Sequence, residues 1–359
     1  MTTSTDFLVN KAKLDDTRIA ESDLGDLEDG QILLEVEKFA LTANNITYAV
    51  MGEQMAYWNF FPGEEGWGRI PVWGFATVAE SRHPDIATGE RVYGYLPMSS
   101  HVVVEPGKVT DGTFSDMAAH RQPMNPVYNN YRRLAADPAH NPELEAHRAL
   151  FEPLFMTSFL IEAFMQREDY YGAKSLIMTS ASSKTGMALA QVAKARSPEI
   201  ERVGLTSSGN IEFVKGLDLY DRVLAYDAVG ELDADTPSVV VDFAGNGKTL
   251  AAIHTHFGDS LKYSCLVGAT HWDARGQGGE LPGPTPILFF APDHVVAMTT
   301  DLGPEGFARE VGKAWAGFIG EAKGWVDVIR REGGVGVAET YGKLLLGNAS
   351  PRDGFILSL

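Results

Sequence analysis

The sequence contains very little cysteine: Cys265 is the single thiol among 359 residues. One thiol cannot form an intrachain disulfide, and it cannot supply the two or more thiolates of many structural zinc sites. Residues 1–6 lack the basic and apolar segments of a secretion signal, and the richest apolar stretch, residues 156–165, is short and interrupted by Glu162. We therefore expect a cytoplasmic protein.

Positive charge is also scarce. The chain has 30 Lys and Arg against 48 Asp and Glu, which gives a net charge of −18. Such a charge repels both the phosphates of nucleic acids and anionic lipids. We expect a small-molecule substrate as the partner, with neither nucleic acid nor a membrane.

The order of apolar segments predicts an α/β protein with two domains. In the first third, short strand-like segments indicate a β-rich domain. From residue 154 onward, helices alternate with strands, which is typical of βαβ units in a doubly wound parallel sheet. The expected strands are residues 31–40, 89–94, 101–104, 174–179, 202–206, 222–226, 238–243, 262–268 and 355–357, and the expected helices are residues 154–165, 185–196, 211–217 and 308–331.

Residues 119–149 form a polar, aromatic segment that is punctuated by proline. We expect a long loop or a pair of short helices there, and long loops in compact domains are usually functional or disordered. Tyr128, Tyr131 and Arg132 are candidate substrate-binding residues, because together with Arg133 they would suit a lid over a planar or anionic substrate. The alternative is a solvated interaction loop.

The turn between the expected strand 174–179 and helix 185–196 lies where a dinucleotide fold binds the pyrophosphate. Gly186 occupies one glycine position of the usual fingerprint, whereas Ser180 and Ser183 replace glycines. An ordinary strand-to-helix turn is therefore the alternative. The expected phosphate-binding residues are Ser180, Ser182, Ser183, Lys184, Thr185 and Gly186.

The end of the next strand bears on the choice between NADH and NADPH. Thr206, Ser207 and Ser208 stand where an NAD-specific enzyme carries an acidic residue for the ribose. Small hydroxyls leave room for a 2′-phosphate, and Lys184 and Lys215 would supply positive charge, so NADPH is the expected cofactor. The alternative is that these hydroxyls only cap the following helix.

Several short segments together resemble the medium-chain dehydrogenase/reductase superfamily, in particular a divergent subgroup of its zinc-free quinone oxidoreductase and enoyl reductase branch. They are the loop and helix at residues 176–194, the segment 216–226 that ends in Tyr226, the turn Gly89–Gly94 and the asparagine motif at residues 43–48.

The resemblance implies a Rossmann dinucleotide-binding domain over residues 151–289. Residues 1–150 and 290–359 would form a β-rich, GroES-like substrate domain, with residues 119–149 as an insertion, and the cofactor would lie in the cleft between the domains. The resemblance also implies a homodimer. Further residues expected to line the cofactor are Tyr226, Phe243, Val267, Gly268 and Phe289.

The chain departs from zinc-dependent relatives, because it lacks their cysteine and Gly-His-Glu ligands as well as the four cysteines of their structural zinc. His254 and His256 are two residues apart on an expected helix, so their rings point to different faces. We therefore expect no metal. The acidic residue of the family's asparagine motif is Thr47 here, so the chain departs from the family on the expected substrate side.

Asn44 and Tyr48 are the candidate catalytic residues. A neutral phenol can hydrogen-bond the acceptor oxygen or deliver a proton after hydride transfer. The alternative is that Tyr48 is a core aromatic and that Asn44 satisfies a turn. The expected function is zinc-independent, NADPH-dependent reduction of an activated C=C or carbonyl group in a quinone, an enal or enone, or an enoyl thioester. A catalytically silent NADP(H)-binding sensor or scaffold is the alternative.

Overall fold

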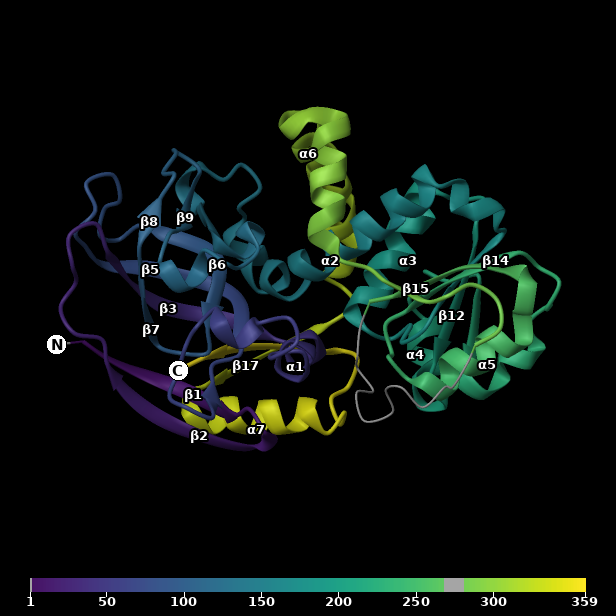
Figure 1. Ribbon diagram of the computed structural model, residues 1–359, viewed down its shortest axis with the longest axis horizontal. Helices are drawn as coiled ribbons and strands as arrows, with labels where there is room; N and C mark the ends of the chain where they lie inside the picture. The colour runs from purple at the N-terminus through teal and green to yellow at the C-terminus, as the bar shows by residue number, and fades with distance from the viewer. Residues whose placement is uncertain (1, 268–280) are drawn as a thin grey trace. The chain divides into compact units, whose positions relative to one another are not determined.

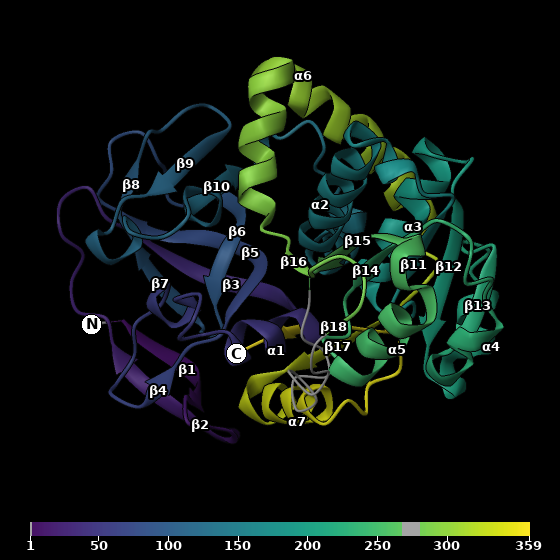
Figure 2. The same ribbon diagram turned by 45° about the vertical axis from the view of Figure 1, so that its right-hand side comes forward.

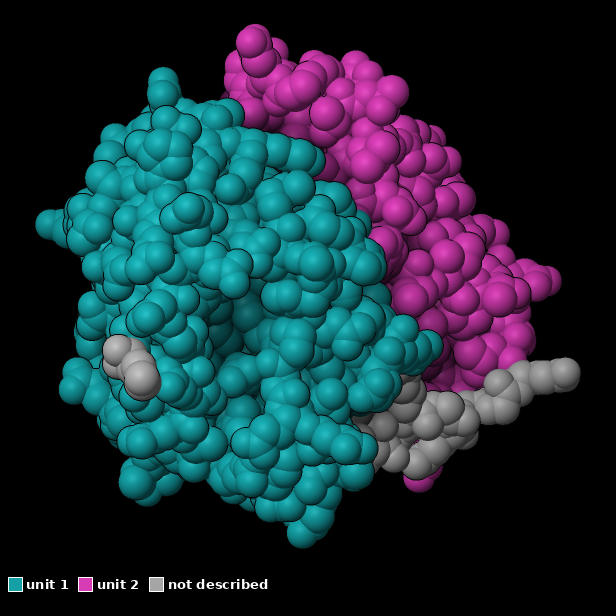
Figure 3. All heavy atoms as spheres, turned by 60° about the vertical axis from the view of Figure 1, so that its left-hand side comes forward, with its two compact units in different colours: residues 1–150, 326–359 teal, residues 151–325 magenta. Residues whose placement is uncertain are grey.

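The computed structural model describes residues 2–267 and 281–359. The chain divides into two compact units, residues 1–150 with 326–359 and residues 151–325, which are coloured separately in Figure 3. The second boundary therefore lies at residue 326, whereas the sequence placed it at residue 290. The difference arises because a long helix after residue 290 packs within the second unit, where Phe318 contacts Phe151 and Phe155.

The first unit is built on strands, as the sequence predicted (Figure 1). A small sheet has the order β2-β1-β4, and a nine-stranded sheet has the order β17-β18-β3-β5-β6-β10-β9-β8, with β7 also paired to β3. The small-sheet strands are β1 (Thr3–Asn10), β2 (Lys13–Asp23) and β4 (Trp67–Gly68). The large sheet contains β3 (Ile32–Leu41), β5 (Pro71–Ser81), β6 (Arg91–Pro97), β7 (His101–Val104), β8 (Pro106–Gly107), β9 (Thr113–Asp116), β10 (Asn130–Arg133), β17 (Asp327–Glu332) and β18 (Asp353–Ser358).

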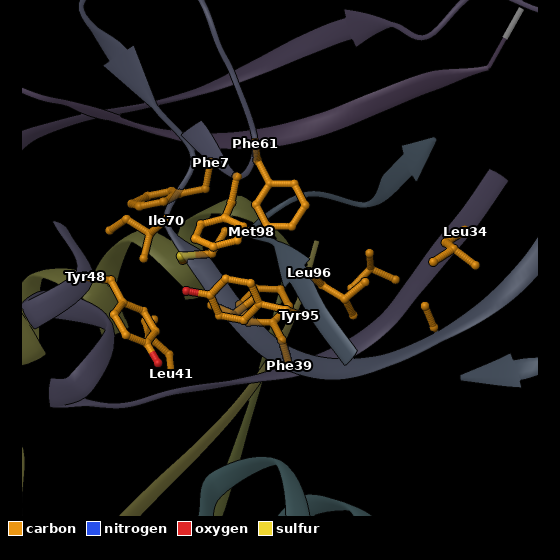
Figure 4. Packing of buried hydrophobic residues seen from close by; sticks show 14 of the residues in the cluster. Phe7, Leu34, Phe39, Leu41, Tyr48, Phe61, Ile70, Tyr95, Leu96 and Met98 are labelled. Atoms are coloured by element: carbon orange, nitrogen blue, oxygen red, sulfur yellow. The ribbon is translucent and has the colours of Figure 1, made fainter. Parts of the chain in front are cut away.

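Two helices accompany these sheets, α1 (Ala43–Val50) and α7 (Gly333–Leu345). Figure 4 shows how Phe7, Phe39 and Leu96 pack in the core of this unit, and all three are fully buried. Tyr95 on β6 and Tyr48 on α1 belong to the same cluster. The core of the first unit therefore extends to the aromatic residues of the asparagine motif.

The polar segment 119–149 contains a strand that its sequence pattern did not predict. β10 pairs antiparallel with both β6 and β9, and it is flanked by short 3-10 helices, Pro126–Asn129 and Leu134–Ala136. Gly94 on β6 makes room for this strand, because a Cβ atom there would lie 2.5 Å from the Tyr131 ring. The segment is thus partly a loop and partly an inner strand of the large sheet.

The second unit contains a six-stranded, entirely parallel sheet (Figure 2). Its order is β13-β12-β11-β14-β15-β16, which in chain order is 3-2-1-4-5-6, the order of a dinucleotide-binding fold. The strands are β11 (Ser175–Met178), β12 (Glu201–Thr206), β13 (Arg222–Ala225), β14 (Ser238–Asp242), β15 (Leu261–Leu266) and β16 (Ile287–Leu288). This topology confirms the expected fold class.

Helices connect and cover these strands. They are α2 (Glu145–Arg167), which begins in the first unit, α3 (Lys184–Arg196), α4 (Ile211–Lys215), α5 (Gly247–Phe257) and α6 (Ala291–Ala322). α6 begins earlier than the sequence predicted because it continues through a kink, where Gly303 has a φ of 70° and is followed by Pro304. None of the helices in the described residues has the length and apolar character needed to cross a membrane.

Candidate functional site

The loop after β11 adopts the conformation that the glycine fingerprint normally provides. Ser180 has a φ of 49°, in the left-handed region that favours glycine. The hydroxyl of Tyr226 accepts a hydrogen bond from the Ser180 backbone N–H at 3.1 Å and lies 3.3 Å from its Oγ. Because these contacts hold Ser180 in place, a serine takes the position of the first glycine.

Hydroxyl groups fix the remainder of this loop against the sheet. The Oγ of Ser182 accepts hydrogen bonds from Thr206 at 3.2 Å and from Asn210 at 3.1 Å. Ser183 caps α3 by accepting a hydrogen bond from the Gly186 N–H at 3.0 Å. The loop therefore leads directly into the N-terminus of a 13-residue helix, whose dipole and first N–H groups favour an anion.

Gly186 permits close packing of this helix on the loop. A Cβ atom at this position would lie 2.8 Å from the carbonyl oxygen of Ser180, closer than real Cβ contacts. Lys184 and Thr185 stand in the first turn of α3, and both are partly exposed. The six loop residues selected from the sequence thus lie together at the carboxyl end of β11.

The neighbouring strand β14 is fixed to the same edge by a buried hydrogen-bond network. Thr179 donates to the Asp242 carboxylate at 2.5 Å and accepts from the backbone N–H of Phe243 at 2.9 Å. Val267 in turn donates its N–H to the Asp242 carbonyl at 2.9 Å. Phe243 therefore lies beside the end of β11 and Val267 beside the end of β14, whereas Gly268 lies outside the described residues.

Phe289 follows β16 and is buried. Its N–H donates to the Leu266 carbonyl at 2.8 Å, and its ring stacks on His294 with 4.2 Å between the centroids. The pKa of His294 is lowered by burial and by the nearby Arg167 charge, which favours a neutral ring. The Phe289 side chain therefore packs against the start of α6.

The end of β12 carries the hydroxyls expected near the ribose. Thr206 is buried, whereas Ser207 and Ser208 are exposed at the turn before α4. Lys215 is exposed at the last position of α4 and forms an ion pair with Glu212 at 3.6 Å. The three hydroxyls and Lys215 thus belong to one strand-turn-helix segment next to the phosphate loop.

The first unit brings together six aromatic residues that we call the aromatic cluster. Its members are Tyr48, Tyr57, Phe60, Trp73, Tyr95 and Tyr128. Tyr48 lies 4.5 Å from Tyr57 and 5.9 Å from Tyr95 between ring centroids. Tyr128, from the polar segment, lies 4.8 Å from Tyr95. Figure 4 shows the hydroxyl end of Tyr95 directed toward the side where Tyr48 lies.

Several polar groups surround the Tyr48 hydroxyl. Burial, followed by the neighbouring Tyr128, raises the pKa of Tyr48, and the nearby polar side chains of Trp73, Asn44 and Tyr95 oppose that shift. The Nε1 of Trp73 and the hydroxyl of Tyr95 are both buried without a well-formed hydrogen bond among the described residues. The phenol of Tyr48 therefore stays protonated at neutral pH, beside polar groups that have capacity to bind a ligand.

The structure distinguishes the two asparagines of the motif. Asn45 accepts a hydrogen bond from the backbone N–H of Thr42 at 2.8 Å and donates to the Pro71 carbonyl at 2.9 Å, so it fixes the start of α1. Asn44 is partly exposed in the first turn of α1, with its side chain toward Tyr48. The turn role that Asn44 had as an alternative is filled by Asn45.

Two of the proposed lid residues lie in or against the large sheet. Tyr131 is fully buried, and its hydroxyl donates to the Tyr95 carbonyl at 2.9 Å. Arg132 is partly exposed on β10, and its guanidinium lies 5.9 Å from the centre of the Tyr93 ring. Tyr128 alone of the three belongs to the aromatic cluster.

Sequence reasoning missed four members of the aromatic cluster, namely Tyr57, Phe60, Trp73 and Tyr95. A signal existed in the dense aromatic run at residues 57–61 and in the alternation of Tyr93 and Tyr95 along β6. Neither signal could be connected with Tyr48, because the contacts cross between separate strands and loops.

The histidines of α5 serve the fold. His254 is fully buried and hydrogen-bonded to the Pro282 carbonyl and the Ser264 hydroxyl, at 2.8 and 2.9 Å. His256 contacts the Leu232 carbonyl at 2.9 Å. Within residues 2–267 and 281–359, no group of three or more His, Cys, Asp or Glu is arranged to hold a metal ion.

Comparison with known families gives the identity of the chain at the family level. The model of a family described as "Protein of unknown function (DUF2855)" matches residues 39–350. The chain belongs to this family. No curated protein sequence matches this DUF2855 chain.

Solved structures resemble this DUF2855 chain over its whole length. CurA from Vibrio vulnificus in complex with NADPH has a TM-score of 0.59 and 13% identity, covering 98% of each chain. TarJ from S. aureus in complex with NADPH has a TM-score of 0.55 and 9% identity, and a mutant form of enoyl thioester reductase from Candida tropicalis has a TM-score of 0.55 and 11% identity; both cover 100% of each chain. At these identities the likeness concerns the fold, and it confirms the fold implied by the resemblance to medium-chain dehydrogenases/reductases.

Proposed function

We propose that this chain is a zinc-independent, NADPH-dependent reductase that transfers hydride to an activated C=C or carbonyl group. The observation that carries the proposal is the phosphate loop, in which Ser180 adopts a left-handed conformation before the capped N-terminus of α3. The loop lies at the first strand of a parallel sheet with dinucleotide-binding strand order. Full-length likeness to structures solved with NADPH supports the same conclusion.

The residues of the second unit fit a dinucleotide phosphate. Gly186 allows the backbone to pack closely, and Ser183 and the first turn of α3 offer donors to the pyrophosphate. Ser207, Ser208 and Lys215 would bind the 2′-phosphate, with Lys184 adding charge. Tyr226 would hold the loop, and Phe243, Val267 and Phe289 would lie toward the nicotinamide side.

NADPH supplies the hydride when it is bound, so the protein must orient the acceptor and stabilise the charge that forms on it. We assign those tasks to Tyr48 and Asn44. The neutral phenol of Tyr48 would donate a hydrogen bond to the acceptor oxygen and then give up its proton. Asn44 would hold that hydroxyl in position through its side chain.

The proposal is tested by adding NADPH to the purified chain and then a panel of quinones, enals and enoyl thioesters. Binding is followed by the change in nicotinamide fluorescence, and turnover is followed by the loss of NADPH absorbance with each acceptor. We expect binding and acceptor-dependent oxidation. Binding without oxidation across the whole panel would favour an NADP(H)-binding sensor or scaffold.

The preference for NADPH over NADH is the first specific prediction. Ser207→Asp places a carboxylate near the 2′-phosphate, so like-charge repulsion should raise the Kd for NADPH about tenfold while the Kd for NADH changes little. Titrations of both nucleotides against parent and variant measure this change. Ser207→Asn, of the same size without charge, is the control; equal affinities in the parent would contradict the assignment.

We also propose that the chain forms a homodimer through β16, the edge strand of the six-stranded sheet among the described residues. β16 ends the sheet order, and its two residues, Ile287 and Leu288, are each 50% exposed. An exposed apolar edge strand favours pairing with another strand.

A further inference from the structure

Arg121, in the polar segment of the first unit, is a charged side chain with no exposed surface. Its Nη2 donates to the Tyr128 carbonyl at 2.8 Å, and its Nε donates to the Asn129 side chain at 2.9 Å. The nearest carboxylate, Asp116, lies 3.7 Å from Nη1. Burial of a charge is costly unless it is paired and hydrogen-bonded, so such an arrangement is maintained only by a well-formed set of partners.

The same guanidinium reaches a second loop. Its Nη1 donates to the Phe60 carbonyl at 3.5 Å, and the group lies 5.2 Å from the Phe60 ring and 4.8 Å from the Phe61 ring. Phe60 and Tyr128 are therefore both attached through their backbone carbonyls to one side chain. A lysine could not replace it, because a single ammonium lacks the planar set of donors that contacts both loops.

Phe60 and Tyr128 belong to the aromatic cluster, with 5.3 Å between their ring centroids. Tyr128 is partly exposed, whereas Tyr48, Tyr57 and Tyr95 are buried. Tyr128 is therefore the most solvent-accessible of these four phenols. The partly exposed Trp73, 6.3 Å from Tyr128, stands beside it.

From these contacts we infer that the Tyr128 side chain forms one wall of the acceptor site and limits the size of the acceptor that can bind. Arg121 is then the positioning residue that holds Tyr128 in place. The inference rests on the proposed function, because it assigns the aromatic cluster to the acceptor. It also gives the segment 119–133 a role, that of bringing Tyr128 to the cluster.

The composition of the cluster indicates the class of ligand. Its six members are aromatic and carry no carboxylate or ammonium group, while hydroxyls and the indole N–H of Trp73 supply donors. Flat rings stack favourably on such walls, and donors bind a carbonyl oxygen. The cluster therefore suits a flat, uncharged acceptor whose permitted size is set by Tyr128.

The test uses uncharged para-quinones with one, two and three fused rings. Tyr128→Ala should raise the ratio of kcat/KM for the three-ring quinone to that for the one-ring quinone about tenfold, because the wall is removed. Arg121→Lys should raise KM for all three quinones, with the Kd for NADPH unchanged. Arg82→Lys is the matched control, since Arg82 is exposed and pairs only loosely with Glu80 at 3.9 Å.

A second readout separates this inference from the proposed function. Binding of the same quinones, measured without NADPH, should quench the fluorescence of Trp73, and that part of the quenching should be absent in Trp73→Phe. Quenching without turnover would support the role of Tyr128 in ligand binding and would contradict only the assignment of the chain as a reductase. The inference would be overturned if a folded Tyr128→Ala or Tyr128→Leu variant kept the parent's preference for quinone size in both activity and quenching.

Arg121 has its own decisive outcome. If Arg121→Lys lowered the melting temperature but left KM and quenching equal to those of Arg82→Lys, the guanidinium would be purely structural, and the positioning role would be wrong.

Discussion

The phenol of Tyr48 is the residue on which the proposed reaction depends most. Burial and the neighbouring Tyr128 raise its pKa, so the proton is present at neutral pH. Tyr48→Phe should lower kcat about 10²–10⁴-fold while the Kd for NADPH stays the same, because the hydroxyl acts on charge that forms only in the transition state. Steady-state kinetics with a quinone and a separate NADPH titration measure the two quantities.

Two controls accompany this prediction. Tyr341→Phe removes a phenol that donates to the Leu14 carbonyl, outside the aromatic cluster, and should leave kcat unchanged. Asn44→Ala should reduce turnover in the same way as Tyr48→Phe, because Asn44 would hold the Tyr48 hydroxyl in position. Full activity in Tyr48→Phe would make Tyr48 a packing residue and leave proton delivery to water.

Ser180 explains why the nucleotide loop departs from the glycine fingerprint. The glycine fingerprint was correctly placed between a strand and a helix, but a serine in a left-handed conformation does not match it. The contact that stabilises Ser180 comes from Tyr226, 46 positions later. A hydrogen bond between residues so far apart leaves no local pattern, so its existence could not be inferred from neighbouring residues.

Among the secondary-structure elements, the start of α2 depends on a charge network in the first unit. The carboxylate of Glu145 lies 2.9 Å from Arg91, 2.5 Å from Lys38 and 2.8 Å from His140. Burial raises the pKa of the Glu145 carboxyl group. The hydrogen bonds from these three residues outweigh burial and lower this pKa to about 2. The carboxylate also stands at a helix N-terminus, where negative charge is favoured.

The lowered pKa makes this stability dependent on pH. The contribution is fully present above the ordinary pKa of 4.5 and is lost as the pH falls toward 2. Glu145→Gln should therefore lower the free energy of unfolding by about 2 kcal/mol at pH 7 and by progressively less below pH 4.5. Urea unfolding at several pH values measures this, with the exposed Glu143→Gln as control; an effect of Glu145→Gln that did not shrink in acid would contradict it.

β10 shows which elements sequence patterns miss. The alternating pattern at residues 31–40 and the turn and apolar segment at residues 89–94 predict strands, and the structure contains β3 and β6 there. β10 has the sequence Asn-Tyr-Arg-Arg, which reads as a polar loop. It becomes a strand because it fits between β6 and β9 and because Gly94 leaves space for Tyr131. Tertiary pairing, which a local pattern does not contain, decides its conformation.

For the molecule as a whole, the alternation of helices and strands predicted the fold class, whereas it did not predict where the second unit ends. The kink at Gly303 and Pro304 would normally end a helix, yet residues on both sides belong to α6. Phe318 and Trp325 pack with Phe151 in the second unit. Because these aromatic contacts join segments far apart in the sequence, α6 belongs to the second unit.

The homodimer proposed at β16 is a prediction about the assembled molecule. Leu288→Lys places a charge on the exposed edge strand, which opposes strand pairing between chains. We expect the parent to sediment as a dimer and the variant to sediment as a monomer at micromolar concentration, with NADPH affinity retained. Lys262→Glu, an exposed change on the adjacent β15, is the control; a monomeric parent would contradict the prediction.

The single cysteine, Cys265, can be used to measure local opening of the sheet in the second unit. Cys265 is fully buried on β15, between Val241 and Ile287 in register, and burial followed by Asp242 raises its pKa. A thiol reagent can therefore react only when the sheet opens, so the labelling rate measures the opening equilibrium of that strand. We expect NADPH to bind beside Phe243 and Val267, so that opening of β15 disrupts the nucleotide site. NADPH at 100 times its Kd should then slow labelling of Cys265 about 100-fold. Mass spectrometry counts the single adduct without interference from any other thiol, and a rate that NADPH did not change would place the nucleotide away from this edge of the sheet.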